Sequence, residues 1–221
     1  MHSITSVPLA DIARTTPAST RVFMRHHLDF CCGGKRTLAE ACELAGLDPV
    51  VVAAEVEQEA RKNSAEPDWL TRPAAELCDY IETRFHAALR RDLPLLIEAA
   101  IKVERVHVKR PEVPTGLAAL LADMLAEMEH HMGKEEQVLF PMIRRGVPGE
   151  RMYMPVSALE SEHDIHGQML TRIRELTNDF QVPERGCATW RALYQGLEAM
   201  EDELMHHIHL ENNILFPRAV R

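Results

Sequence analysis

Apolar residues recur three or four positions apart through most of the chain, which is the spacing of one helix face. The pattern is longest in four segments, whose connections contain Pro or Gly. These segments cover approximately 74–108, 116–144, 155–179 and 183–218. Four helices joined by short connections predict an up-down-up-down four-helix bundle. Pro94 falls inside the first helix, where its missing amide donor is expected to cause a kink.

Shorter helical patterns precede the bundle. They cover 18–26, 37–45 and 49–61. Gly46 suits the end of the second helix, and Asp48 followed by Pro49 suits the start of the third. The pattern predicts a small module of short helices.

Residues 63–73 are polar, contain two prolines and break the helical spacing, so we interpret them as a linker. The expected organisation is a small helical N-terminal domain over 1–64 and a four-helix bundle over 74–221. Glycine (10 residues) and aromatic residues (5%) are scarce, which favours helix over strand. The predicted fold class is all-α.

The net charge and the spacing of the cysteines limit which partners and which cellular compartment we expect for this chain. The net charge is −9 and no dense basic run is present, so nucleic acid is not an expected partner. No apolar run approaches the roughly 20 residues that span a bilayer, and the first residues do not resemble a signal peptide. Five cysteines without paired spacing suit a reducing compartment. We expect a cytoplasmic protein that does not enter a membrane.

An internal repeat carries the candidate chemistry. At an offset of 76, the sequence HMGKEEQVLFP (131–141) aligns with HIHLENNILFP (207–217). In each copy a histidine precedes a glutamate by four residues, so His131 with Glu135, and His207 with Glu211, project from one helix face. Chance placement of surface His and Glu explains one such pair, but not a repeat of this length.

Two further histidines have matching positions. His86 lies 45 residues before His131, and His163 lies 44 before His207. Four imidazoles and two carboxylates suit a pair of iron ions, with Glu135 and Glu211 as bridges, although manganese and zinc also accept these donors.

The remaining titratable residues have competing interpretations. Cys31 and Cys32 precede two glycines whose backbone amides could approach an anion, which would favour thiolate; packing at a helix corner is the alternative. Cys42, Cys78 and Cys187 are expected to be structural. Three glutamates are either hydrogen-bond acceptors for the ligand imidazoles or solvated charges: Glu127, Glu162 and Glu203. Three histidines are expected to be peripheral: His107, His166 and His209.

Together, residues 131–141, 162–164 (EHD), 207–217 and DFCCGGKRTLAEAC (29–42) resemble the RIC family, the bacterial iron-sulfur cluster repair di-iron proteins of the YtfE/ScdA type. The resemblance implies a hemerythrin-like bundle that holds two iron ions joined by an oxo bridge. It also implies six ligands: His86, His131, Glu135, His163, His207 and Glu211.

The resemblance further implies repair of iron-sulfur clusters damaged by nitric oxide or oxidative stress, by iron donation or nitric oxide handling. Cys31 and Cys32 would take part, and damaged iron-sulfur proteins and small diatomics would be the partners. Two other functions stay open at this point: reduction of nitric oxide to nitrous oxide, and binding or sensing of O₂ or NO. Homodimer formation is an expectation from the resemblance alone.

Overall fold

A computed structural model describes residues 4–61 and 67–221 of the chain. Within these residues all regular structure is helical, apart from one isolated bridge between Pro8 and Thr37. The all-α prediction is confirmed. The chain divides into two compact units: the N-terminal unit, which runs to Leu77 and includes Met205–Arg221, and the bundle unit, Cys78–Leu204.

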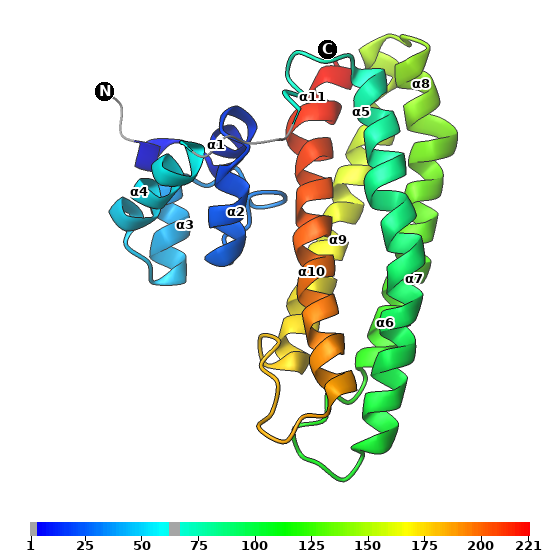
Figure 1. Ribbon diagram of the computed structural model, residues 1–221. Coiled ribbons are helices and arrows are strands. Elements are labelled where there is room, and N and C mark those ends of the chain that lie inside the picture. The colour runs from blue at the N-terminus through cyan, green and yellow to red at the C-terminus, as the bar shows by residue number, and fades with distance from the viewer. Residues whose placement is uncertain (1–3, 62–66) are drawn as a thin grey trace. The chain divides into compact units, whose positions relative to one another are not determined.

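The bundle unit contains four long helices that run alternately up and down, as predicted (Figure 1). They are α6 (Ala87–Val106), α7 (Leu117–Lys134), α9 (Tyr153–Thr177) and the part of α10 (Ala188–Leu210) up to Leu204. Helix α6 packs on α7, and α7 on α9. Arg174 of α9 pairs with Glu201 of α10, and Gly196 of α10 lies against Leu96 of α6. These contacts close the bundle.

Short elements extend and connect these helices. They are α5 (Ala74–Ile81), η2 (Glu82–His86), η3 (Glu135–Leu139), α8 (Phe140–Arg144) and η4 (Gly149–Arg151). Pro94 lies inside α6, and the kink expected there stays a prediction. No helix among the described residues is both long and apolar enough to cross a membrane.

Three π-helical turns interrupt the long helices: η2, η3 and η5 (Glu211–Leu215). The sequence pattern did not predict them. Proline follows η3 and η5 at positions 141 and 217, where it has no amide to donate and crowds the preceding turn. A wider turn relieves that crowding. Each π turn begins or ends at a predicted ligand, and such turns are frequent at functional sites.

The N-terminal unit contains the small helices. They are η1 (Ile4–Ser6), α1 (Leu9–Thr15), α2 (Ser19–Arg25), α3 (Leu38–Ala45) and α4 (Pro49–Ala60), together with the end of α10, η5 and α11 (Phe216–Ala219). Their core is apolar and includes Val22, Phe23, Phe30, Leu38 and Val56. Helix α1 was not predicted, whereas α2, which has the same length of seven residues, was.

Local capping explains why the predicted helices begin and end where they do. The Asp48 side chain accepts a hydrogen bond from the Val50 amide at the start of α4. Gly46 ends α3 in the left-handed region with φ 68°, as expected for a glycine at this position. Thr37 and Glu40 form a reciprocal capping box on α3.

The linker expected over 63–73 is described only in part, because residues 62–66 lie outside the described residues. From Pro67 to Pro73 the chain forms turns, and α5 begins at Ala74 as predicted. Arg218 donates hydrogen bonds to the carbonyls of Trp69 and Arg72, each at 2.7 Å. The C-terminal residues therefore hold this strip of chain.

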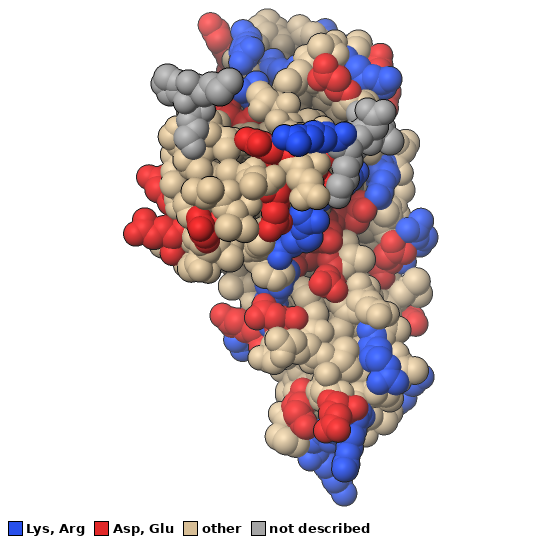
Figure 2. Space-filling view, turned by 60° about the vertical axis from the view of Figure 1, so that its left-hand side comes forward, with Lys and Arg blue, Asp and Glu red and all other residues tan. Residues whose placement is uncertain are grey.

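On the face drawn in Figure 2, acidic side chains are interspersed with basic ones over the coloured residues. Such mixing keeps a surface solvated without creating a large field of one sign.

Candidate metal centre

Four of the predicted ligands lie together inside the bundle unit. His86 ends η2, His131 lies on α7, Glu135 begins η3 and His163 lies on α9. All four side chains are at most 1% exposed. Glu135 Oε2 lies 3.3 Å from His86 Nε2 and 3.5 Å from His131 Nε2. The carboxylate therefore sits between imidazoles from two different helices.

His163 completes this group. Its Nε2 atom lies 3.0 Å from Nε2 of His131, and the two rings are 4.7 Å apart between centroids. His131, Glu135 and His163 each offer a ligand atom within 4.8 Å of the others. Two helices and a π turn thus direct donor atoms at one buried point.

The second repeat copy lies in the N-terminal unit. His207 and Glu211 are 1% and 0% exposed, and His207 Nε2 is 2.8 Å from Glu211 Oε1. Like Glu135, Glu211 begins a π turn. Helix α10 runs without a break from Ala188 to Leu210, so His207 is carried by the same helix that forms the fourth side of the bundle unit.

Two carboxylates, Glu136 and Glu162, contact the Nδ1 atoms of two imidazoles, and we call them the outer carboxylates. Glu136 Oε1 lies 2.8 Å from His86 Nδ1, and Glu162 Oε2 lies 2.9 Å from His131 Nδ1. A carboxylate only accepts hydrogen bonds, so each Nδ1 carries the proton and donates it. In the neutral imidazole this leaves Nε2 unprotonated, which is the form that binds a metal.

Each outer carboxylate also has a cationic partner. Arg90 makes two hydrogen bonds to Glu136, of 2.7 and 3.2 Å, and Lys134 pairs with Glu162. Burial acts to raise the pKa of Glu136, but hydrogen bonds from Arg90 and His86 outweigh it and lower the pKa below its usual value. Glu136 therefore stays ionised and fixes the His86 tautomer.

Only one of the two outer carboxylates is among the three glutamates considered from the sequence as hydrogen-bond acceptors for the imidazoles. Glu162 does accept a hydrogen bond from a ligand imidazole, although from His131 across the bundle. Glu203 does not: it accepts from Arg84 at 2.6 Å. Glu127 is exposed and so corresponds to the solvated interpretation. Glu136 was missed, although its place directly after Glu135 directs it to a neighbouring helix face.

Two histidines expected to be peripheral are buried. His166 is 1% exposed, and its ring lies 4.9 Å from that of His131. His209 is 2% exposed, and its Nδ1 lies 2.8 Å from the Asn213 side-chain nitrogen. Burial, with a smaller contribution from His206, lowers the pKa of His209 to about 3. An i,i+3 spacing from His163 was the available signal for His166.

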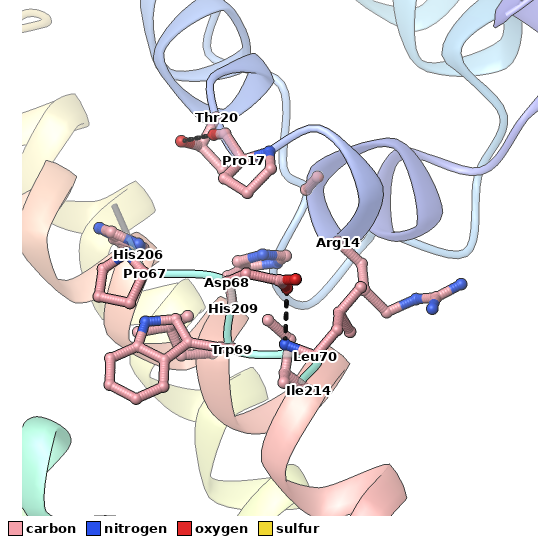
Figure 3. Close-up of a pocket in the computed structure, with 12 residues that line it drawn as sticks. Arg14, Pro17, Thr20, Pro67, Asp68, Trp69, Leu70, His206, His209 and Ile214 are labelled. Carbon is pink, nitrogen blue, oxygen red and sulfur yellow. Dashed lines mark hydrogen bonds between the residues drawn. The ribbon is translucent and has the colours of Figure 1, made fainter. Parts of the chain in front are cut away.

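Figure 3 shows His206 and His209 beside Asp68 and Trp69 at a small cavity of about 20 Å³ within the N-terminal unit. A space of this size holds roughly one water molecule. His107, the third histidine, is partly exposed, and its Nε2 lies 3.3 Å from Cys187 Sγ.

The donor set fits a cation. Glu135 is fully buried, and an ionised carboxylate in a dry interior is unfavourable unless it is paired or binds a metal. Imidazole nitrogen with carboxylate oxygen suits iron, and also manganese and zinc. The described residues thus supply candidate ligands and the outer hydrogen bonds that orient two of them.

Removing an outer carboxylate should weaken metal binding. We expect Glu136→Gln or Glu162→Gln to lower iron affinity about 10–100-fold, because the amide no longer fixes the imidazole tautomer. Competition with a chelator of known affinity measures this change. Glu160→Gln, an exposed change on the same helix as Glu162, is the control. Equal iron affinity in all variants would contradict the assignment.

Cys31 and Cys32 lie in the turn between α2 and α3, which we call the cysteine turn (residues 29–34). The expectation that the backbone amides here favour thiolate is wrong for Cys31. Both cysteine amides donate to Asp29 Oδ1, at 3.2 and 2.9 Å. A hydrogen bond with Cys32, then burial, raise the pKa of Cys31 well above its ordinary value. Without a metal, Cys31 is therefore a thiol.

The other cysteines behave mostly as expected. Cys42 and Cys78 are fully buried among apolar residues, and a structural role explains them. None of the five cysteines, all of which are described, forms a disulfide.

Comparisons with known proteins agree with this geometry. The model of the family described as Hemerythrin HHE cation binding domain matches residues 54–219, and the model described as domain of unknown function DUF542 (ScdA_N) matches 5–60. The proteins named iron-sulfur cluster repair protein YtfE from Citrobacter koseri and from Escherichia coli O157:H7 are each 46% identical to this chain over 213 residues, 96% of either sequence. The protein of that name from Shigella boydii serotype 4 is 45% identical over the same share. The chain belongs to the hemerythrin HHE cation-binding family and, within it, to the family of YtfE iron-sulfur cluster repair proteins.

Proposed function

We propose that this chain is a di-iron protein that repairs iron-sulfur clusters damaged by nitric oxide or oxidative stress, with iron donation as its contribution. The observation that carries the proposal is the buried Glu135 carboxylate between the imidazoles of His86 and His131. It occurs in a chain 46% identical over 96% of its length to proteins named for cluster repair.

The proposed centre unites both repeat copies. Its ligands are His86, His131, Glu135, His163, His207 and Glu211, with the two glutamates bridging two iron ions that an oxo group also joins. Three observations support this union. The copies share the histidine-glutamate spacing, each glutamate begins a π turn, and the hemerythrin family model spans both copies.

The residues of the chain position and shield such a pair. Burial of the ligands excludes water, which strengthens the hold of each carboxylate on a cation. Glu136 with Arg90, and Glu162 with Lys134, keep two imidazoles in the binding tautomer. Iron bound there supplies a cation that exchanges ligands and changes oxidation state.

We further propose that Cys31 and Cys32 act in transfer of the cargo. The Asn212 side chain donates to the Cys31 carbonyl at 3.2 Å, and Asn212 directly follows Glu211 in the chain. The proposed partners are damaged iron-sulfur proteins, with nitric oxide or another diatomic as the damaging agent. A reducing cytoplasm suits the two thiols, and a homodimer and the domain boundaries 1–64 and 74–221 belong to the same proposal.

Cluster repair is tested directly with an iron-sulfur enzyme. We expect the iron-loaded protein to restore activity to an apo or nitric-oxide-treated cluster enzyme under anaerobic conditions with sulfide and reductant. An equal amount of free iron is the control, because any iron source supports some reassembly. Recovery no greater than this control would refute iron donation.

The metal content itself is measured on the same preparation. Iron analysis should give two ions per chain, and the Mössbauer spectrum should show a coupled pair. A single iron per chain, or uncoupled high-spin iron, would contradict the dinuclear centre while leaving the family assignment intact.

A further inference from the structure

The cysteine turn brings together three metal-binding side chains outside the bundle ligands. Asp29, Cys31 and Cys32 each present a ligand atom within 4.8 Å of the others. All three belong to the N-terminal unit. Asp29 is exposed and Cys32 is partly exposed, so the group is reached from solvent.

The distance between the two sulfur atoms matches chelation of one ion. Cys31 Sγ and Cys32 Sγ are 3.8 Å apart. Two thiolates on a tetrahedral ion, with metal–sulfur bonds of about 2.3 Å, lie roughly 3.8 Å apart. The sulfur atoms therefore hold the spacing of a tetrahedral edge before any metal binds, and little rearrangement is needed.

Asp29 supplies a third donor at a compatible distance. Its Oδ1 atom lies 3.4 Å from Cys31 Sγ. On a tetrahedral ion with a metal–oxygen bond of about 2.1 Å, oxygen and sulfur ligands lie about 3.6 Å apart. Three protein ligands leave one position open, which is the arrangement of sites that exchange ligands rather than of closed structural sites.

The two glycines of the cysteine turn allow the backbone to lie close to Asp29 and Phe30. A Cβ atom at Gly33 would lie 2.9 Å from Asp29 Oδ2, and one at Gly34 would lie 2.4 Å from the Phe30 carbonyl oxygen. Glycine is required at position 34, where the contact is with backbone, whereas a side chain at position 33 would displace Asp29. The carbonyls of Phe30 and Cys31 accept hydrogen bonds from Asn213 and Asn212 at 3.1 and 3.2 Å. The turn is thus fixed to the residues that follow Glu211.

We propose that Asp29, Cys31 and Cys32 form a second, mononuclear site for a thiophilic divalent cation, with one exchangeable position. The identification of its cargo as Fe(II) rests on the proposed function, whereas the site itself rests on this geometry. It would receive or release single ions beside the chain segment that carries Glu211.

Binding replaces two protons with one metal ion. A divalent cation joins the two sulfurs, each thiol loses its proton to water, and no electron is transferred. A hydrogen bond with Cys32, then burial, raise the pKa of the Cys31 thiol, so metal binding displaces that proton at neutral pH. Apparent affinity should therefore rise at least about tenfold per pH unit.

The experiment adds Co(II) anaerobically to the full-length, iron-loaded protein. Tetrahedral Co(II) absorbs visibly, and a sulfur-to-metal charge-transfer band appears only if thiolate binds. We expect one Co(II) per chain with that band. Cys31→Ser and Cys32→Ser should each weaken binding at least tenfold. Asp29→Asn should also weaken binding about tenfold, because the amide oxygen still accepts both backbone hydrogen bonds but lacks the charge.

Two matched variants are controls. Asp68→Asn changes another aspartate that accepts a backbone amide in a turn, and Cys187→Ser removes a partly exposed cysteine elsewhere. Both should leave the band unchanged. Thermal unfolding of Asp29→Asn verifies that its turn is intact. Absence of the band, its persistence in both Cys31→Ser and Cys32→Ser, or an apparent affinity that does not rise with pH would overturn the proposal.

The cobalt experiment and the cluster-repair experiment distinguish failure of the proposed site from failure of the proposed function. A cobalt band in a protein that repairs no cluster would refute iron donation and support the site. Cluster repair by a protein without the band would refute the site and leave the proposed function standing.

Discussion

Replacing Glu135 with leucine is expected to reduce bound iron from the two ions per chain of the proposed centre to one or none. The Glu135 carboxylate lies 3.3 and 3.5 Å from the Nε2 atoms of His86 and His131, which fits the bridge of the proposed centre. Loss of an outer hydrogen bond typically weakens metal binding 10–100-fold. Loss of the bridge itself should exceed that range, to more than about a hundredfold. Iron analysis after gel filtration measures the result.

The same variant should be stable without metal, which separates ligand loss from misfolding. Glu135 is fully buried, and replacing buried charge by a well-packed apolar side chain is often neutral or stabilising. We expect the metal-free variant to melt at or above the metal-free parent, whereas the rise in Tm that iron gives the parent should vanish. Glu127→Leu, exposed on the preceding helix, should behave as the parent. Two tightly held irons in Glu135→Leu would refute the bridging assignment.

Features that depend on short-range chemistry were predicted well. Helix α4 begins where Asp48 and Pro49 place it, because a cap and a first-turn proline act within three residues. The four candidate ligands in the bundle unit were identified from the repeat and from the matching positions of His86 and His163. His131 and Glu135 lie close together because a spacing of four residues places both on one helix face.

Features that depend on contacts between side chains far apart in the sequence were missed. Glu136 and Glu203 are both glutamates on bundle helices, but only Glu136 faces a ligand imidazole; Glu203 meets Arg84 instead. The sequence does not show which cation stands opposite each one. The raised pKa of Cys31 was missed for a similar reason, because it arises mainly from a hydrogen bond with Cys32 and from burial, and burial depends on the folded chain.

The π turns were missed because the hydrophobic spacing hardly changes when one turn widens by one residue. Their effect on the site is nonetheless direct, since Glu135 and Glu211 each occupy the first position of such a turn. A straight α-helix through the same residues would turn the following apolar side chains onto a different face. The proline at 141 or 217 is the sequence feature that accompanies them.

The second large effect is expected in the ion pair that joins α9 to α10. Glu201 is 4% exposed, and Arg174 donates to both of its carboxylate oxygens. Arg174→Met would leave a buried carboxylate without its cation, which typically lowers the free energy of unfolding by about 3–5 kcal/mol. Denaturant unfolding of the metal-free protein at pH 7 measures this loss. Arg172→Met removes an exposed pair with Glu175 and should change it by less than about 1 kcal/mol.

The pH dependence of this loss identifies its cause. Burial raises the pKa of Glu201, and Arg174 offsets part of that rise. A carboxyl whose folded pKa exceeds its unfolded pKa holds its proton more firmly in the folded protein, so stability falls as pH rises through that interval. Without Arg174 the folded pKa rises further and the interval widens toward neutral pH. The difference between variant and parent should therefore shrink to about 1 kcal/mol near pH 4, where Glu201 is protonated. A loss of equal size at pH 4 and 7 would show that lost packing, rather than the unpaired charge of Glu201, lowers the stability. In that case the double variant Arg174→Met with Glu201→Met should also fail to recover stability.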